Sequence, residues 1–282
     1  MLYCGASGWS RQDWNGVVFP TLPPRGFHPL EFLAQRVNLL EVDRSFHRPL
    51  RPEVTHVWAR KVEANRDFRF AVQLARQFTH ERNLDAADIK AFKDGLWPLM
   101  KLKRLGCLIM RFPWNFRFTT VNRDFLVELR RTFHEFPLVA EVRHTSWQYD
   151  EALGTLMDYK IGYCNVDQPE GLKAAPPTAL ITSAVGYVRL LGRGGDDWMD
   201  ETASANYFYT PRELGAWQAR IERVNQFATA TYVVLANSVA GRSMMNAMQL
   251  RSMLETAPPK VVVPRREIAP PIRTYESLPI SA

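Results

Sequence analysis

Three residues of the 282-residue chain are candidates for moving a proton. Glu41 and Glu141 each lie in a short, otherwise apolar segment, and two such carboxylates could form a pair. His80 can exchange a proton near neutral pH, and carboxylates and imidazoles are the groups that general acid–base catalysis uses. We therefore take Glu41, Glu141 and His80 as the catalytic candidates.

Arginines lie on the same kind of segment and outnumber these carboxylates. They are Arg111, Arg143, Arg189 and Arg193. A planar guanidinium group suits a carboxylate or phosphate in bidentate geometry, so surplus arginines predict an anionic ligand. The alternative is a purely structural network of arginines and glutamates, because an unpaired buried charge costs on the order of several kcal/mol.

Glycine-rich segments follow the last two strand-like segments. One is Gly192–Gly195, and the other, residues 237–243, leads into the last helical pattern. In α/β barrels the loops at these two places often bind phosphate through backbone N–H groups and a helix N-terminus. Gly192 and Asn237 are therefore expected to contact the anion, although a glycine-rich loop can also be only a turn.

Aromatic side chains follow several strand-like segments and could border the same site. Tryptophan can stack on a sugar or a nucleobase there, or it can plug the top of the barrel. Trp9 and Trp147 are the ligand-binding candidates of this kind, and the remaining members of the set are Trp14, Trp114 and Trp198.

A divalent metal is a further alternative. Asp167 joins Glu41, Glu141 and His80 as an oxygen or nitrogen ligand that a cation could use. We disfavour the metal because no two histidines have ligand-like local spacing and nearby arginines would repel a cation. Asp167 is kept as a ligand-binding candidate, and no particular cofactor or oligomeric state is indicated.

Alternating strands and helices must position these side chains. The strands are expected at 2–7, 39–43, 68–74, 105–112, 138–143, 162–166, 187–191 and 232–236. Helices are expected at 30–36, 52–63, 86–101, 122–136, 151–159, 211–227 and 243–255, with a short helix or none between the sixth and seventh strands. This order predicts an α/β fold, and eight repeats favour a single closed (β/α)8 TIM-type barrel.

Strand alternation predicts which side chains share a face. Glu141 and Arg143 are two residues apart, so both point the same way, and Arg189 and Arg193 follow the same rule. His144 is out of phase with Glu141 and is expected to point toward the helices. The carboxyl-end mouth of the barrel is therefore the expected ligand site.

The bulk composition is that of a globular protein, with 46% hydrophobic and 23% charged residues. We expect one barrel domain over residues 1–257 and an extended, proline-rich basic tail over 258–282. No apolar run approaches the ~20 residues of a membrane span, and the N-terminus has no signal-peptide pattern, so a cytoplasmic protein is expected. Cys107 and Cys164 are expected to be buried and unbridged.

The order of motifs at the strand ends resembles the YecE-like family, domain of unknown function 72, over roughly residues 1–255. The most specific are Gly5-Ala6-Ser7-Gly8-Trp9 and Glu141-Val142-Arg143-His144-Thr145-Ser146-Trp147. The resemblance implies the barrel fold without assigning a reaction.

The chain departs from the pattern of this family at four positions. Gln73 stands where the family usually has Lys, and Arg111 where it has Gln. If these two are inward neighbours, the exchange moves one positive charge between strands and is compensatory. Leu191 replaces His and Ala236 replaces Asn, which suggests a specialised subgroup.

Three functions remain open. The first is a barrel that binds a small phosphate- or carboxylate-bearing molecule at its mouth and could be an acid–base enzyme. The second, by analogy with barrel endonucleases, is a protein that binds or processes nucleic acid. The third is a non-catalytic binding module. The net charge of +7 is compatible with the first two, although the basic residues are spread along the chain.

Overall fold

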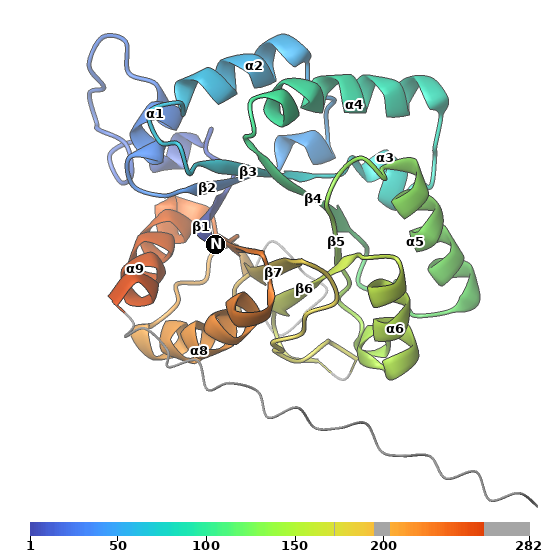
Figure 1. Cartoon of the computed structure of the whole chain (residues 1–282). Coiled ribbons are helices and arrows are strands. Elements are labelled where there is room, and N and C mark those ends of the chain that lie inside the picture. Colours follow the sequence, from blue (N-terminus) through green and yellow to red (C-terminus); the bar gives the residue numbers. More distant parts are fainter. Residues whose placement is uncertain (172, 195–203, 257–282) are drawn as a thin grey trace, which may run out of the picture.

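Eight parallel strands form a closed barrel in the computed structural model, which describes residues 1–171, 173–194 and 204–256 (Figure 1). The strands are β1 (Leu2–Ser7), β2 (Leu39–Val42), β3 (Arg69–Gln73), β4 (Leu105–Arg111), β5 (Leu138–Glu141), β6 (Gly162–Asp167), β7 (Val185–Leu190) and β8 (Ala230–Leu235). Each strand pairs with the next, and β8 pairs with β1. The single (β/α)8 barrel expected from the sequence is confirmed.

Helices surround the barrel on its outside (Figure 1). They are α1 (Pro29–Ala34), α2 (Pro52–Lys61), α3 (Arg76–Thr79), α4 (Ala86–Lys101), α5 (Thr120–Thr132), α6 (Asp150–Asp158), α8 (Pro211–Phe227) and α9 (Arg242–Thr256). Several begin where the local sequence stabilises a first turn. Proline occupies the first turn of α2 and α8, and Thr210 with Glu213 forms a capping box at α8.

The connection from β6 to β7 has no helix in its described residues, 168–171 and 173–184, as the sequence predicts. The Asn165 side chain holds this connection instead. Its Oδ1 accepts hydrogen bonds from Thr178 Oγ1 and from the Leu180 backbone N–H, each at 2.7 Å. The predicted tail, residues 258–282, lies outside the described residues.

Apolar side chains fill the barrel near its amino-terminal end. Tyr3 and Tyr232 stack across it with ring centroids 5.1 Å apart, and Ala71, Cys107 and neighbouring side chains pack in the same inner cluster. Cys107 and Cys164 are both fully buried and free, which confirms the expectation for these thiols. Burial raises the pKa of the Cys107 thiol well above its ordinary value. The interior therefore leaves room for polar side chains only toward the carboxyl ends of the strands.

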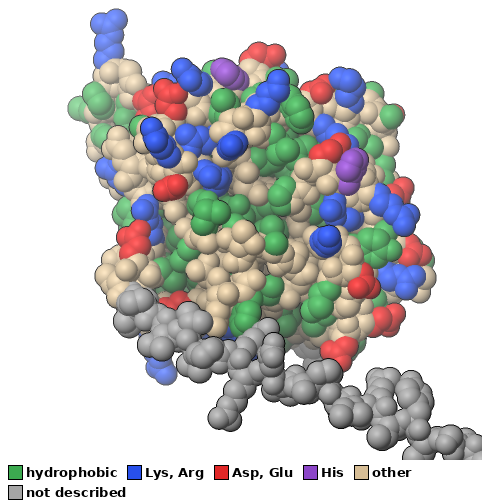
Figure 2. Space-filling view, in the orientation of Figure 1, with side chains coloured by type: hydrophobic (Ala, Val, Ile, Leu, Met, Phe, Trp, Pro, Cys, Tyr) green, Lys and Arg blue, Asp and Glu red, His purple; other side chains and the backbone are tan. Residues whose placement is uncertain are grey.

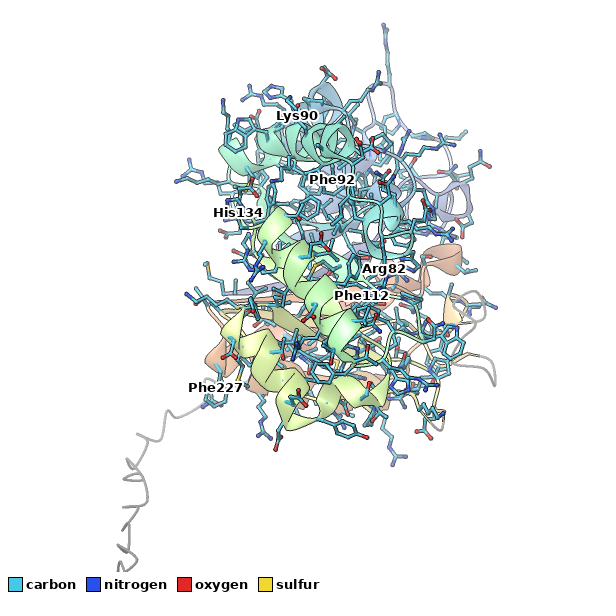
Figure 3. The ribbon with its side chains drawn as sticks, turned by 90° about the vertical axis from the view of Figure 1, so that its right-hand side faces the viewer. Arg82, Lys90, Phe92, Phe112, His134 and Phe227 are labelled. Carbon is cyan, nitrogen blue, oxygen red and sulfur yellow. The ribbon has the colours of Figure 1, made fainter. Side chains whose placement is uncertain are left out.

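A second, larger apolar layer lies between the strands and the helices. Phe92 and Phe112 point into it, whereas Lys90 and His134 are exposed (Figure 3). In the orientation of Figure 1, acidic and basic side chains are interspersed over the visible face (Figure 2). Within the described part of the chain, no helix has the length and apolar character required to span a membrane.

Candidate functional site

Six polar side chains meet where the inward positions of the strands reach the carboxyl end of the barrel. Strand register places Ser7 beside Glu41 and Arg111 beside Glu141. The six are Ser7, Glu41, Gln73, Arg111, Glu141 and Arg189, and we call them the polar ring. Glu41, Glu141, Arg111 and Arg189 are brought together as strand alternation predicts.

Glu41 is the most heavily hydrogen-bonded member of the polar ring and is fully buried. Its Oε1 accepts from Ser7 Oγ at 2.7 Å and from Gln73 Nε2 at 2.6 Å. Its Oε2 accepts from the Tyr187 hydroxyl at 2.7 Å. Burial alone would raise the pKa of Glu41, but the charge of Arg189 and these hydrogen bonds outweigh it, and the pKa lies below its ordinary value.

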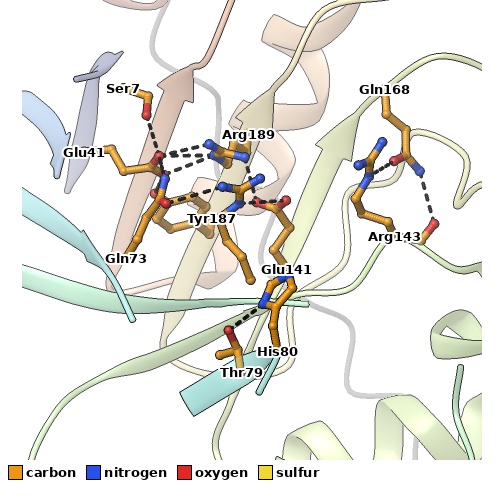
Figure 4. A network of polar contacts seen from close by, with 11 residues as sticks. Ser7, Glu41, Gln73, Thr79, His80, Glu141, Arg143, Gln168, Tyr187 and Arg189 are labelled. Atoms are coloured by element: carbon orange, nitrogen blue, oxygen red, sulfur yellow. Dashed lines mark hydrogen bonds and ion pairs between the residues drawn. The ribbon is translucent and has the colours of Figure 1, made fainter. Parts of the chain in front are cut away.

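Arg189 joins the two glutamates (Figure 4). Its Nη2 lies 3.1 Å from Glu41 Oε1, and its Nη1 lies 2.9 Å from Glu141 Oε2. Arg111 reaches the same cluster, with Nε 3.4 Å from Glu141 Oε1 and Nη1 3.4 Å from Gln73 Oε1. Gln73 and Arg111 are thus inward neighbours, as the compensatory exchange requires. The glutamates hold the guanidinium groups in place.

A cavity of about 260 Å³ opens above the polar ring. Four of the residues that line it are arginines: Arg44, Arg111, Arg143 and Arg189. Among the described lining residues, Asp43 supplies the one carboxylate. The lining is therefore rich in groups that recognise anions.

The cavity-lining residues of the β2–α2 connection, Asp43, Arg44 and His47, are absent from the set predicted from the sequence. Asp43 is two residues after Glu41, so alternation continued one step past the end of β2 would have found it. Burial and the charge of Glu41 raise the pKa of Asp43. Strand alternation could not have found Arg44 and His47, because Arg44 begins the short 3-10 helix Arg44–Phe46 and His47 follows it.

Arg143 is 2% exposed and lines the cavity from the end of β5. Its Nε donates to Gln168 Oε1 at 2.7 Å, and Gln168 Nε2 donates back to the Arg143 carbonyl at 3.2 Å (Figure 4). Gln168 follows β6, so two neighbouring strand ends fix the orientation of this guanidinium group. His144, the next residue, is buried and its Nδ1 lies 2.9 Å from Ser146 Oγ.

Arg193 does not lie beside Arg189, contrary to the alternation argument. Its Nε lies 3.0 Å from both carboxylate oxygens of Asp167, which is fully buried and points away from the polar ring. The Tyr209 hydroxyl also forms a hydrogen bond with this carboxylate, so Asp167 is satisfied within the protein. Arg193 and Asp167 line a separate cavity of about 240 Å³. The two arginines therefore cannot act as one clamp on a small anion.

The backbone conformation of Gly192 explains why strand alternation gave the wrong direction for Arg193. Its φ of +102° turns the chain after β7, so the period-two rule no longer applies beyond it. Its N–H donates to the Tyr209 hydroxyl at 2.8 Å and so is engaged within the protein. Gly194 is described but does not line the mouth cavity, and Gly195 lies outside the described residues.

Substitution of Gly192 by alanine is expected to lower the free energy of unfolding by about 2–4 kcal/mol, because it combines backbone strain with overpacking. The new Cβ would lie 2.1 Å from the Ser204 carbonyl oxygen. Gly154 of α6 is the matched control, since nothing lies within 4 Å of its added Cβ. Urea denaturation of Gly192→Ala and Gly154→Ala measures both. Equal stability of the two variants would contradict the close approach at Gly192.

Asn237 and His80 also lie outside the cavity lining. Asn237 is fully buried, and its Nδ2 donates to the Tyr207 carbonyl and to Asn246 Oδ1, each at 2.9 Å. His80 lies at the edge of the network, with Nδ1 2.9 Å from Thr79 Oγ1 and its ring against Phe46 (Figure 4). The amide of Asn237 thus connects the segment before α8 to α9, which is a structural arrangement.

Trp9 and Trp147 pack against the protein and do not line the cavity. Trp9 contacts Trp58 of α2 edge to face at 5.0 Å. Trp147 is fully buried, stacks on Phe116 at 5.4 Å and donates its indole N–H to the Phe116 carbonyl. Neither lines the cavity. These contacts favour the packing alternative over stacking on a ligand, and both residues follow strand ends, where alternation no longer sets direction. Trp198 lies outside the described residues.

All four departures from the family pattern lie on the cavity wall: Gln73, Arg111, Leu191 and Ala236. Leu191 and Ala236 present apolar groups there. These two make part of the cavity wall apolar, whereas Gln73 and Arg111 are members of the polar ring. In the described residues no group of three or more His, Cys, Asp or Glu side chains is placed to hold a metal ion.

A parallel barrel with a polar cavity at the carboxyl ends of its strands is the arrangement of (β/α)8 proteins, which bind their ligands there. Within that class the chain belongs to the DUF72 family, because the family model described as "Protein of unknown function DUF72" matches residues 3–271. The resemblance to the YecE-like family is thereby confirmed.

Solved structures of the same family are similar to the chain. A DUF72 family protein from Thermotoga maritima MSB8 is 27% identical, with a TM-score of 0.78, over 90% of this chain and 99% of that one. A DUF72 family protein from Enterococcus faecalis V583 is 20% identical, with a TM-score of 0.78, over 91% and 96% of the two chains. No curated protein matches the chain.

Proposed function

We propose that this barrel binds a small molecule with a phosphate or carboxylate group in its mouth cavity. The observation that carries the proposal is the lining of four arginines around a cavity of about 260 Å³. Guanidinium groups recognise such anions through short, charge-assisted hydrogen bonds. Ligand pockets commonly measure about 300–1,000 Å³, so the cavity suits a ligand at the small end of that range.

In this proposal Glu41 positions Arg189 and does not transfer a proton. Its two oxygens already accept hydrogen bonds from Ser7, Gln73, Tyr187 and Arg189. A general base needs a free lone pair within reach of the substrate, and Glu41 does not line the cavity. Glu141 is held in the same way by Arg111 and Arg189.

Calorimetric titration with inorganic phosphate and with sulfate tests the proposal. Arg143→Ala is expected to weaken binding about tenfold or more, because a hydrogen bond to a charged group contributes about 1.5–3 kcal/mol. Arg60→Ala is the matched control, since Arg60 is exposed on α2 and pairs with Glu63 on the surface. If neither anion binds the wild-type protein, or if both variants bind equally well, the proposal fails.

Nucleic-acid binding is the second candidate, favoured by five exposed arginines on two neighbouring connections at the mouth. They are Arg44, Arg48 and Arg51 after β2, and Arg76 and Arg82 after β3. Phosphate contacts of this kind release counterions, so affinity would fall steeply with salt. Fluorescence anisotropy with a labelled single-stranded oligonucleotide measures this. Binding insensitive to Arg48→Ala and Arg76→Ala would exclude these connections as the contact.

A further inference from the structure

Among the described residues that line the mouth cavity, one is a carboxylate, Asp43. Asp43 follows β2 and comes so close to Gly8 that an added Cβ there would lie 2.6 Å from Asp43 Oδ2. The backbone N–H groups of Asp43 and Arg44 donate to this carboxylate. No salt bridge to Asp43 is found among the described residues, although the charge of Arg11 lowers its pKa and so partly offsets burial and Glu41. Asp43 is thus an acceptor that faces the cavity, unlike Glu41, whose oxygens are engaged by the polar ring.

A carboxylate in an anion site would repel a plain anion. At 4 Å two like charges cost about 4 kcal/mol at an effective dielectric constant of about 20. An anion can still bind if it places a hydrogen-bond donor against the Asp43 carboxylate and its own negative charge against the arginines. A hydroxyl group is the neutral donor that does this without neutralising the anion.

The rest of the lining fits such a molecule. Ser7, Ser204 and Ser238 present hydroxyls, and Leu191 and Ala236 present an apolar wall that a short carbon skeleton can contact. The volume of about 260 Å³ lies just below the range of about 300–1,000 Å³ that is common for ligand pockets. The cavity therefore suits a small ligand.

We infer that the ligand of the mouth cavity is a small hydroxylated anion, such as a phosphorylated polyol, and that Asp43 recognises its hydroxyl group. This inference rests on the proposed function and adds the class of ligand. Burial and the charge of Glu41, which raise the pKa of Asp43, make this carboxylate a stronger acceptor than an exposed one. The arginines bind the phosphate, and Asp43 provides the selectivity.

Two ligands that share a three-carbon skeleton test this inference. Glycerol 3-phosphate and n-propyl phosphate differ only in the two hydroxyls of the first. By calorimetry, the wild-type protein is expected to bind glycerol 3-phosphate about tenfold more tightly than n-propyl phosphate, since the added bond has a charged acceptor. Asp43→Ala is expected to abolish this ratio while leaving the affinity for n-propyl phosphate unchanged or higher. Asp43→Asn, which preserves the shape, is expected to reduce the ratio as well.

Asp124→Ala is the control, because Asp124 is exposed on α5. Equal affinity of the wild-type protein for the two ligands, or a ratio that survives both substitutions of Asp43, would overturn the inference and leave the proposed function standing. If glycerol 3-phosphate, n-propyl phosphate and inorganic phosphate all fail to bind the wild-type protein, the proposed function itself is wrong.

Discussion

Replacement of Glu41 by glutamine is expected to lower the free energy of unfolding by on the order of 3 kcal/mol, because it removes one of the two glutamate charges that contact the buried Arg189 guanidinium. Arg189 is 5% exposed in its side chain and contacts both Glu41 and Glu141, so the variant keeps one carboxylate for it. Urea denaturation at neutral pH measures the loss. Glu128→Gln is the matched control, since Glu128 is an exposed residue of α5.

This loss is also expected to depend on pH. The pKa of Glu41 in the folded protein lies below its ordinary value of 4.5. The carboxylate therefore contributes stability that is fully present above about pH 4.5 and is lost as the pH falls through the folded pKa. The difference between wild type and Glu41→Gln should shrink over that acidic range. A difference that stays constant with pH would mean that the charge of Glu41 is not what stabilises the ring.

The largest effect is expected from replacement of Arg189 by methionine. This change leaves Glu41 and Glu141 buried without their shared cation, and breaking a buried ion pair costs about 3–5 kcal/mol. Two carboxylates are affected, so we expect the upper end of that range or a failure to fold. Urea denaturation of Arg189→Met against the control Arg60→Met measures the effect.

The triple variant Arg189→Met, Glu41→Gln, Glu141→Gln is expected to recover at least half of that loss. Replacing a buried ionic group with uncharged residues of similar size is often neutral or stabilising. Calorimetry with sulfate should detect no binding to this variant. Recovered stability together with lost sulfate binding would show that these three charged side chains contribute more to ligand binding than to the stability of the fold. If the triple variant is as unstable as Arg189→Met alone, or still binds sulfate, the ring is structural.

Local patterns were sufficient to predict the barrel and much of its polar ring. The helices Ala86–Lys101 and Pro211–Phe227 have the same bounds as their predicted ranges, because apolar periodicity and a capping residue act within a few residues. Glu41 and Arg189 point inward because alternation is a property of each extended strand.

The same rule failed wherever the strand had already ended. Arg193 follows Gly192, whose positive φ redirects the chain. Trp9 and Trp147 follow the ends of β1 and β5 and pack against α2 and Phe116. Beyond a strand end, side-chain direction depends on turn geometry and on neighbours, and neither is encoded in a two-residue period.

By itself, the sequence determined that eight strands and intervening helices close into one barrel, and that Glu41, Glu141, Arg111 and Arg189 face its interior. Only the tertiary structure decided how these charges are shared. Arg189 binds a glutamate 148 positions away in the chain, whereas Arg193 binds Asp167 outside the mouth cavity. Coulomb energy depends on distances in space, and residues so far apart in sequence acquire those distances only when the barrel closes.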